Sequence, residues 1–230
     1  MSRPLILVLL ESSLETVPPS IASHPAILKT ARRRRKKPLE MLLDISLHYH
    51  AMKDLPKKEK RGRPDIVHVS LLEALESPLC KSGLLRIAVH TIGGHAIFVD
   101  PATRIPRNYN RFVGLIEQLF KEGRVPPGSE KPLMHIKTLT LQQFLRELGA
   151  RGLILLREAC EYKPLSEVVK QAVSEKMAIG IGGFPHGDFE EETLRHADYC
   201  YSIYRAPLST LIVVSRTIAA AEKIFGLMEL

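Results

Sequence analysis

Apolar residues along the chain recur at two spacings, one typical of strands and one typical of helices. Short apolar runs predict strands at 4–10, 85–89, 95–99, 133–136, 153–156, 177–181 and 199–203. Apolar residues every three or four positions predict helices at 39–50, 112–120, 141–148, 165–173, 189–194 and 211–225, and a further amphipathic helix that begins at 65–69. Gly93-Gly94 is placed for a hairpin turn between two of the strands. Strands that alternate with helices predict an α/β domain with a largely parallel sheet.

Length and composition narrow the class of protein. The chain has 230 residues, of which 45% are hydrophobic and 25% charged, as in an ordinary folded protein with a sizeable core. These values exclude a disordered chain, a collagen-like chain and a coiled coil. The longest apolar run, 5–10, is far shorter than the roughly 20 residues that span a bilayer, and no cleavage site follows it. We therefore expect an intracellular protein.

The cysteines and histidines give no sign of a metal or a disulfide. Cys80, Cys160 and Cys200 are odd in number and scattered, and no CxxC motif occurs. We expect neither a disulfide framework nor a zinc site built from cysteines, which suits a reducing compartment. The histidines have no metal-ligand spacing, so each is expected to be a core or surface residue.

Positive charge is concentrated in one segment. Residues 29–63 hold 13 Lys and Arg against four Asp and Glu, a net charge of +9. Because the whole chain carries +8, the other residues sum to −1. Such a segment indicates a polyanionic partner, nucleic acid first and an anionic membrane second. The membrane is the weaker choice, since no basic helix with bulky apolar anchors is present. A solvated tail remains the plain alternative.

A glycine-rich stretch follows one predicted strand. Residues 179–189 read IGIGGFPHGDF, so glycines come at the carboxyl end of the strand, where ligands bind in open α/β sheets. The spacing matches neither the dinucleotide nor the P-loop motif, and a tight turn without a ligand is an equal alternative. The loops after strands 153–156 and 199–203 end on the same edge, so all three loops are candidates for the walls of one pocket.

Arginines form a second candidate site. Arg104, Arg107 and Arg111 are spaced by three and four residues, and Pro106 in the first helical turn would put the last two on one face. Arg63 and Asp65 flank Pro64, which favours contact between their side chains. Guanidinium groups suit phosphate and stack on bases, so the group favours nucleic acid, although each arginine alone reads as a surface residue.

Four motifs together resemble a known family. They are RGRPDIVH at 61–68, RIPRNYNRF at 104–112, IGIGGFPHGDF at 179–189 and YRAPLS at 204–209. The combination is similar to the SPOUT-class ribosomal RNA methyltransferases, and within them to the small-subunit ribosome biogenesis factors that methylate pseudouridine at N1.

The resemblance implies a fold and an assembly. It implies a single α/β domain over 1–230, with a mostly parallel sheet, helices on both faces and a family-specific extension. It also implies a basic RNA-binding segment at about 29–63, and a deep trefoil knot that binds the cofactor at about 150–230. A homodimer is expected.

The resemblance also assigns roles to residues. The expected cofactor-binding residues are Leu156, Gly182, Gly187, Ile203, Tyr204, Arg205, Ala206, Pro207 and Leu208. The expected RNA-binding residues are Arg63, Arg104, Arg107 and Arg111, and the expected catalytic residues are Arg63, Asp65 and Arg107. No metal is expected.

The implied function is methylation of a pseudouridine in a single-stranded hairpin loop of small-subunit ribosomal RNA. The cofactor would be S-adenosylmethionine, which leaves as S-adenosylhomocysteine. The work would belong to small-subunit biogenesis, with ribosomal proteins as further partners, in the cytoplasm or in a eukaryotic nucleolus. The alternative is a non-catalytic assembly factor that binds ribosomal RNA and keeps a vestigial cofactor pocket.

Overall fold

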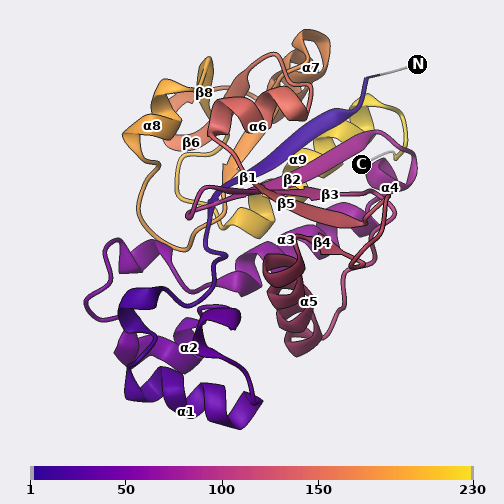
Figure 1. Cartoon of the computed structure of the whole chain (residues 1–230). Helices are drawn as coiled ribbons and strands as arrows, with labels where there is room; N and C mark the ends of the chain where they lie inside the picture. The colour runs from indigo at the N-terminus through magenta and orange to yellow at the C-terminus, as the bar shows by residue number, and fades with distance from the viewer. Residues whose placement is uncertain (1–2, 229–230) are drawn as a thin grey trace.

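The computed structural model describes residues 3–228, and over that range one eight-stranded sheet is covered by helices on both faces (Figure 1). The outermost two residues at each end of the predicted domain lie outside the described residues. The strands are β1 (Leu5–Ser12), β2 (Leu85–Thr91), β3 (His95–Val99), β4 (Arg124–Val125), β5 (Met134–Thr138), β6 (Leu153–Tyr162), β7 (Ala178–Gly182) and β8 (Tyr199–Ser202).

The sheet is mostly parallel, as the sequence predicted. Its order is β4-β5-β3-β2-β1-β7-β6-β8. Neighbouring strands from β2 to β8 pair in parallel, while β3, β5 and β4 add an antiparallel edge. The first antiparallel pair is the predicted hairpin, in which Gly94 turns with a φ of +75°.

The central strand β1 explains why the sheet has two covered faces. All eight of its residues are buried. Leu5, Leu7 and Leu9 pack into one core, and the residues between them pack into the other. A strand buried on both faces needs this continuous apolar run, because successive side chains point to opposite sides.

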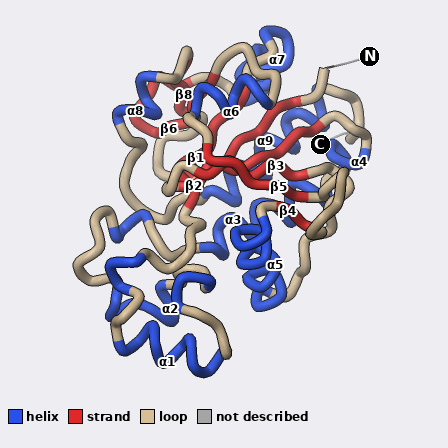
Figure 2. Tube along the Cα trace, viewed as in Figure 1, coloured by secondary structure: helices blue, strands red, loops and turns tan. Residues whose placement is uncertain are grey.

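Apart from α1 and α2, which lie below the sheet, the helices divide between its two faces (Figure 2). They are α1 (Pro25–Arg34), α2 (Ile45–His48), α3 (Pro64–Glu76), α4 (Pro78–Lys81), α5 (Tyr109–Glu122), α6 (Leu141–Glu147), α7 (Leu165–Glu175), α8 (Glu191–Arg195) and α9 (Thr210–Ile224). Short 3-10 helices lie at Pro19–Ile21, Pro38–Glu40, Tyr49–Ala51 and Lys58–Lys60. Apolar residues of α3, α5, α7 and α9 share one core, and those of α6 and α8 share the other.

Between β1 and α3 the chain forms a small lobe with its own apolar core, seen below the sheet in Figure 1. The helix predicted at 39–50 is wrong. A 3-10 helix and the short α2 replace it, and the chain between them is extended. Leu42 packs into the main core and Leu43 into the lobe core, which requires neighbouring side chains to point in opposite directions. The basic run at 32–37 begins in the last turn of α1, a helix that the sequence did not predict.

Glu117 of α5 connects this lobe to the rest of the molecule through ion pairs and a hydrogen bond. Its side chain is only 2% exposed. It accepts hydrogen bonds from Arg34 Nη1 at 2.6 Å and Nη2 at 2.8 Å, from Lys36 Nζ, and from the backbone N–H of Leu42 at 3.0 Å. Two cations of the basic run are therefore internal ion-pair partners.

Glu117→Gln should lower the free energy of unfolding by about 2 kcal/mol. The loss is smaller than for a fully buried pair, because the Arg34 and Lys36 side chains are 24% and 35% exposed and can reach water. Urea unfolding measures the change. The control is Glu122→Gln, an exposed carboxylate at the end of the same helix, which should change stability by less than about 0.5 kcal/mol. Equal effects of the two variants would contradict the connecting role.

Cys160 and Cys200 form a disulfide with Cα atoms 5.7 Å apart, so the expectation of no disulfide is wrong. The two cysteines are 40 residues apart in the sequence. They meet because β6 and β8 pair in parallel with Glu161 opposite Tyr201, which brings the two preceding residues together. Spacing along the chain carries no sign of this tertiary pairing. Cys80 is free and buried.

Replacing both cysteines with alanine should lower the free energy of unfolding by about 2–4 kcal/mol, because the unfolded chain regains the freedom of a long loop. The measurement is urea unfolding of the oxidised wild type and of the double variant. A reductant should destabilise the wild type and leave the variant unchanged. If wild type and variant unfold at the same urea concentration, the bond contributes no stability.

Candidate functional site

A cavity of about 650 Å³ lies at the carboxyl ends of β6, β7 and β8. The loops after β7 and β8 line it, together with residues 156–158 within β6, the first turn of α9 and the start of α3. The prediction that these three segments wall one pocket is confirmed, but β6 extends to Tyr162, so the loop predicted after 153–156 is wrong. Parallel strands bring their carboxyl ends to one edge, so loops far apart in the sequence meet there.

Most of the residues that the sequence assigned to a cofactor line this cavity. They are Leu156, Gly182, Gly187, Ile203, Tyr204, Ala206, Pro207 and Leu208. Arg205 is exposed and does not line it. The apolar members supply a wall, while the glycines line the cavity without side chains.

The loop after β7 leaves the sheet along the end of β1. Gly183 donates its N–H to the Leu10 carbonyl at 2.8 Å, and its own carbonyl accepts from the Ser13 N–H at 2.8 Å. A Cβ on Gly183 would lie 2.2 Å from Ser12 Oγ and 2.9 Å from Ser12 Cα. Glycine is required here because the two backbones touch. On the other side, Thr210 Oγ1 donates to the Gly182 carbonyl at 2.7 Å, which ties α9 to the same loop.

Further along, the loop is held by an ion pair and by two aromatic rings. Arg157 Nε donates to Asp188 Oδ1 at 2.8 Å, and the hydrogen bonds from Arg157 lower the pKa of the Asp188 carboxyl. Phe184 and Phe189 meet edge to face with ring centroids 5.3 Å apart. Arg157 lies beside Leu156 in β6 at the cavity wall, so this contact joins β6 to the loop after β7.

Arg63 and Asp65 lie at the start of α3 and line the same cavity. Arg63 Nε and Nη2 donate to the two Asp65 oxygens, both at 2.8 Å. The hydrogen bonds to Asp65 raise the pKa of the Arg63 guanidinium above its ordinary value. The backbone N–H of Arg63 donates to Ser13 Oγ at 2.8 Å, so the end of β1 also positions this residue. The predicted contact between the two side chains is confirmed.

The other arginines lie outside this cavity. The first turn of α5 is Tyr109–Phe112 and its cap is Asn108, so the prediction that Pro106 opens the helix is wrong. Arg107 precedes the helix and donates to Glu76 Oε2 at 2.7 Å, in a groove between α3 and α9. Arg104 and Arg111 are exposed. The structure therefore does not bring Arg107 to Arg63.

The arginine segment is nevertheless fixed beside α3. His68 hydrogen-bonds through Nε2 to the Pro106 carbonyl at 2.7 Å, and its ring stacks on Phe112 at 4.3 Å. The groove around Arg107 shares Val69 and Leu211 with the larger cavity. The two sites are thus neighbours.

Sequence reasoning gave no role to three residues that shape the site: Lys60, Arg157 and Asp188. Asp188 stands in the glycine-rich motif, where its charge was the only signal. Lys60 was one cation among many in the basic segment. Their partners lie 31 to 130 residues away, so the pairing was not legible in the sequence.

The described residues include neither a cluster of metal ligands nor a membrane-spanning helix. Between residues 3 and 228, no group of three or more His, Cys, Asp or Glu is arranged to hold a metal ion. Within the same part of the chain, no helix combines the length and the apolar character needed to cross a membrane.

Comparisons with known proteins agree with one another. Residues 7–222 match the family model described as EMG1/NEP1 methyltransferase. The "Ribosomal RNA small subunit methyltransferase Nep1" of Staphylothermus marinus is 57% identical over 228 residues, which is 99% of each chain. The protein of the same name from Saccharolobus solfataricus is 46% identical over 220 residues, 96% of this chain and 97% of that protein. The structure of Archaeoglobus fulgidus Nep1 bound to S-adenosylhomocysteine superposes with a TM-score of 0.85 at 41% identity, covering 98% of this chain and 100% of that one.

Gly183→Ala should lower the free energy of unfolding by about 1–3 kcal/mol, because the new methyl group would push the loop away from β1. Thermal and urea unfolding measure the change. Gly114→Ala is the matched control: it lies in α5 with open space around it, and should be neutral or stabilising by up to about 1 kcal/mol. A Gly183→Ala variant as stable as wild type would show that the loop need not touch β1.

Proposed function

The chain belongs to the EMG1/NEP1 methyltransferase family, and on that premise we propose that it methylates a pseudouridine of small-subunit ribosomal RNA at N1, with S-adenosylmethionine as the methyl donor. The role would be in small-subunit biogenesis. The observation that carries the proposal is that one cavity is walled both by β6 with the loops after β7 and β8, and by the Arg63–Asp65 pair. A methyl donor and a base would thus be held next to each other.

The cavity suits the proposed cofactor. Its volume of about 650 Å³ is within the usual range of ligand pockets. Leu156, Ile203 and Leu208 offer an apolar wall for an adenine ring, and Gly182 and Gly187 line the cavity without side chains, so a ligand can approach the backbone there closely. The relative from Archaeoglobus fulgidus binds S-adenosylhomocysteine, the product that such a reaction leaves. When bound, S-adenosylmethionine supplies an electrophilic methyl group, so the protein mainly has to align it.

The Arg63–Asp65 pair suits the proposed base. Uridine has its sugar on N1, whereas pseudouridine is joined to its sugar through carbon and presents an N1–H. That proton must pass to a base, either water or the Asp65 carboxylate, before or during methyl transfer, and negative charge then develops on the pseudouridine ring until N1 takes the methyl group. Arg63 would stabilise this charge, and Asp65 would hold the guanidinium in place. Arg63 is 38% exposed at its side chain, so it can reach a base that has left its stack.

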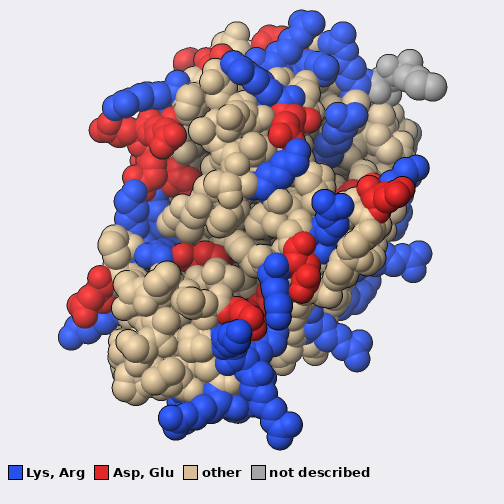
Figure 3. All heavy atoms as spheres, viewed as in Figure 1, with Lys and Arg blue, Asp and Glu red and all other residues tan. Residues whose placement is uncertain are grey.

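The RNA would extend from this cavity over basic surface. Arg104, Arg107 and Arg111 are exposed in the segment beside α3, next to the cavity. Within the segment 29–63, exposed cations that the internal pairs do not use include Arg32, Arg33 and Lys37. Figure 3 shows Lys and Arg side chains gathered at the foot of the molecule, over the α1 lobe. Guanidinium and ammonium groups there would contact phosphates without reading sequence.

The proposal includes a knotted carboxyl-terminal part and a homodimer. Strand β8 lies outside β6, yet the chain returns as α9, which packs on α3 and α7 and contacts the end of β7 through Thr210. This path supports threading of residues 150–230. Val69, Leu208 and Ile212 are apolar residues 37–42% exposed near the start of α9, which supports a second copy on that face.

The test uses labelled S-adenosylmethionine and two RNA hairpins that differ only by pseudouridine or uridine in the loop. We expect label in the first and none in the second. Arg63→Lys should lower kcat about 10²-fold, because a single ammonium cannot replace the guanidinium that Asp65 orients. Arg195→Gln, an exposed arginine on α8, is the control and should keep wild-type kcat.

Two outcomes would overturn parts of the proposal. Equal label in both hairpins would remove the pseudouridine claim and leave a ribosomal RNA methyltransferase. No heat of binding with S-adenosylhomocysteine in calorimetry, together with tight RNA binding, would favour the assembly factor with a vestigial pocket.

A further inference from the structure

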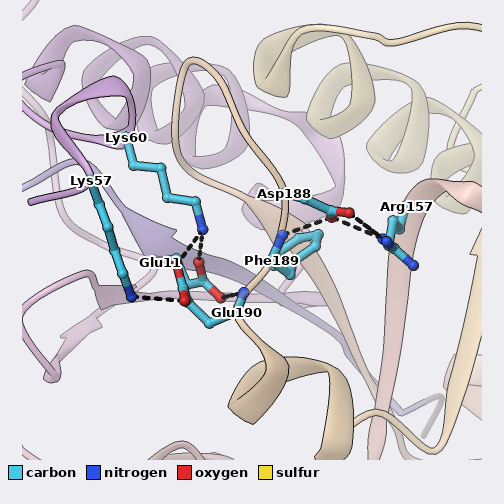
Figure 4. A network of polar contacts seen from close by, with 7 residues as sticks. All are labelled: Glu11, Lys57, Lys60, Arg157, Asp188, Phe189 and Glu190. Carbon is cyan, nitrogen blue, oxygen red and sulfur yellow. Dashed lines mark hydrogen bonds and ion pairs between the residues drawn. The ribbon is translucent and has the colours of Figure 1, made fainter.

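Ion pairs hold the loop that follows β7 on two opposite sides (Figure 4). On one side Arg157 binds Asp188, within the cavity wall. On the other side the contact comes from the basic lobe: Lys60 Nζ donates to Glu190 Oε1 at 2.9 Å and to Glu11 Oε2 at 2.8 Å. The loop thus bridges the cofactor cavity and the lobe that carries the positive charge.

Lys60 is unlike the other lysines of its segment. Its side chain is 4% exposed, although lysines are almost never fully buried unless paired. Glu11 is 8% exposed at its side chain and also accepts the Glu190 N–H at 2.8 Å through Oε1. The pKa of Lys60 is raised, since the hydrogen bonds to the two carboxylates outweigh burial. Lys57 completes the group on the surface side, 2.7 Å from Glu190 Oε2.

Lys60 also touches the part of the loop that lines the cavity. Its Nζ lies 4.7 Å from the centroid of the Phe184 ring. Gly187 has a φ of +94°, and a Cβ there would lie 3.2 Å from Lys60 Cε. Phe184 and Gly187 both line the cavity. A movement of Lys60 would therefore change the shape of the cavity wall.

The same lysine belongs to the segment that presents Arg63. Lys60 ends a 3-10 helix, Lys58–Lys60, and Arg63 follows three residues later as the cap of α3. Between them Arg61 donates to both Glu15 oxygens at 2.7 Å, which fixes the short connection. The backbone of Glu11 adopts a φ of +47° at the irregularity of β1, a conformation that costs a non-glycine residue free energy. Stability alone gives no reason for this arrangement, because an apolar group could fill such a site as well.

We propose that Lys60 is a positioning residue that couples the lobe between β1 and α3 to the loop that follows β7 (the cofactor loop). Through this contact the methyl donor and the RNA would each strengthen the binding of the other. This inference rests on the proposed function. RNA bound at Arg63 would hold the segment 60–63 and hence the loop at Phe184 and Gly187. A filled cavity would hold the same loop and hence the segment that presents Arg63. Because coupling is reciprocal, each ligand should tighten the other by the same factor.

The experiment measures that factor by calorimetry. The affinity for S-adenosylhomocysteine is determined with and without the pseudouridine hairpin, for wild type, Lys60→Met, Lys60→Arg and Lys58→Met. In wild type we expect the RNA to tighten cofactor binding about fivefold or more. Lys60→Met should bring this factor close to one, and Lys60→Arg should restore part of it. Lys58→Met is the matched control, because Lys58 is exposed and donates to the Lys53 carbonyl rather than to the loop after β7; it removes one cation from the same segment, so RNA affinity can fall while the wild-type factor persists.

Two further measurements separate positioning from a general loss of stability. Glu190→Gln keeps the buried Lys60–Glu11 pair and weakens the bonds by which Lys60 and Lys57 hold the loop, so it should fold and still reduce the factor. In turnover, Lys60→Met should raise KM for S-adenosylmethionine more than it lowers kcat, since Lys60 does not touch the reacting atoms. A variant that is merely unstable would lower the active fraction and leave KM unchanged.

The outcomes are distinguishable. If wild type binds both ligands but independently, or if both Lys60→Met and Glu190→Gln keep the wild-type factor, the coupling is overturned while the proposed function stands. If wild type does not bind S-adenosylhomocysteine at all, the proposed function itself fails.

Discussion

The end of β1 is the junction on which the site depends. Within four residues this strand accepts the Gly183 N–H, donates back to the Gly183 carbonyl, accepts the Arg63 N–H through Ser13 Oγ and places the Glu11 carboxylate beside Lys60. The loop after β7 and the arginine segment are 120 residues apart along the chain, at Gly183 and Arg63. They share a wall because both are bonded to the same four residues, 10–13, through backbone or side-chain atoms. Because Gly183 packs directly against Ser12, the loop after β7 cannot shift relative to the end of β1.

The cations of the segment 29–63 fall into two groups: those paired with carboxylates and those exposed to solvent without such a pair. Arg34, Lys36 and Lys60 are bound to buried carboxylates, and Arg61 is bound to Glu15 with little exposure. These pairs orient the lobe against α5 and against the loop after β7. Lys57 and Arg63 add pairs with Glu190 and Asp65. A net charge of +9 therefore overstates the charge that a polyanion would meet, because six of the cations pair with carboxylates from outside the segment.

Two kinds of contact set the geometry of the proposed chemistry. The Arg63–Asp65 pair is local, two residues apart at the start of one helix, and its fork geometry fixes the guanidinium at the cavity. The cofactor loop is held by remote contacts, from Arg157 on one side and from Lys60 on the other. A site that is assembled in this way would respond as a unit when either ligand binds, since no wall of the cavity belongs to one element alone.

The sequence by itself determined what is local or periodic. The apolar run of β1, the hairpin at Gly94 and the Arg63–Asp65 contact all followed from side-chain spacing and backbone preference. Only the tertiary structure decided what depends on distant partners. Leu42 and Leu43 have helical spacing but are drawn into different cores, and Pro106 is held outside α5 by its bond to His68. Cys160 meets Cys200 because β6 pairs with β8, and Lys60 meets Glu11 because the lobe packs against the end of β1. The spacing of residues along the chain determines which face of a helix or strand each side chain occupies. Burial and pairing with distant residues are determined only when the chain has folded.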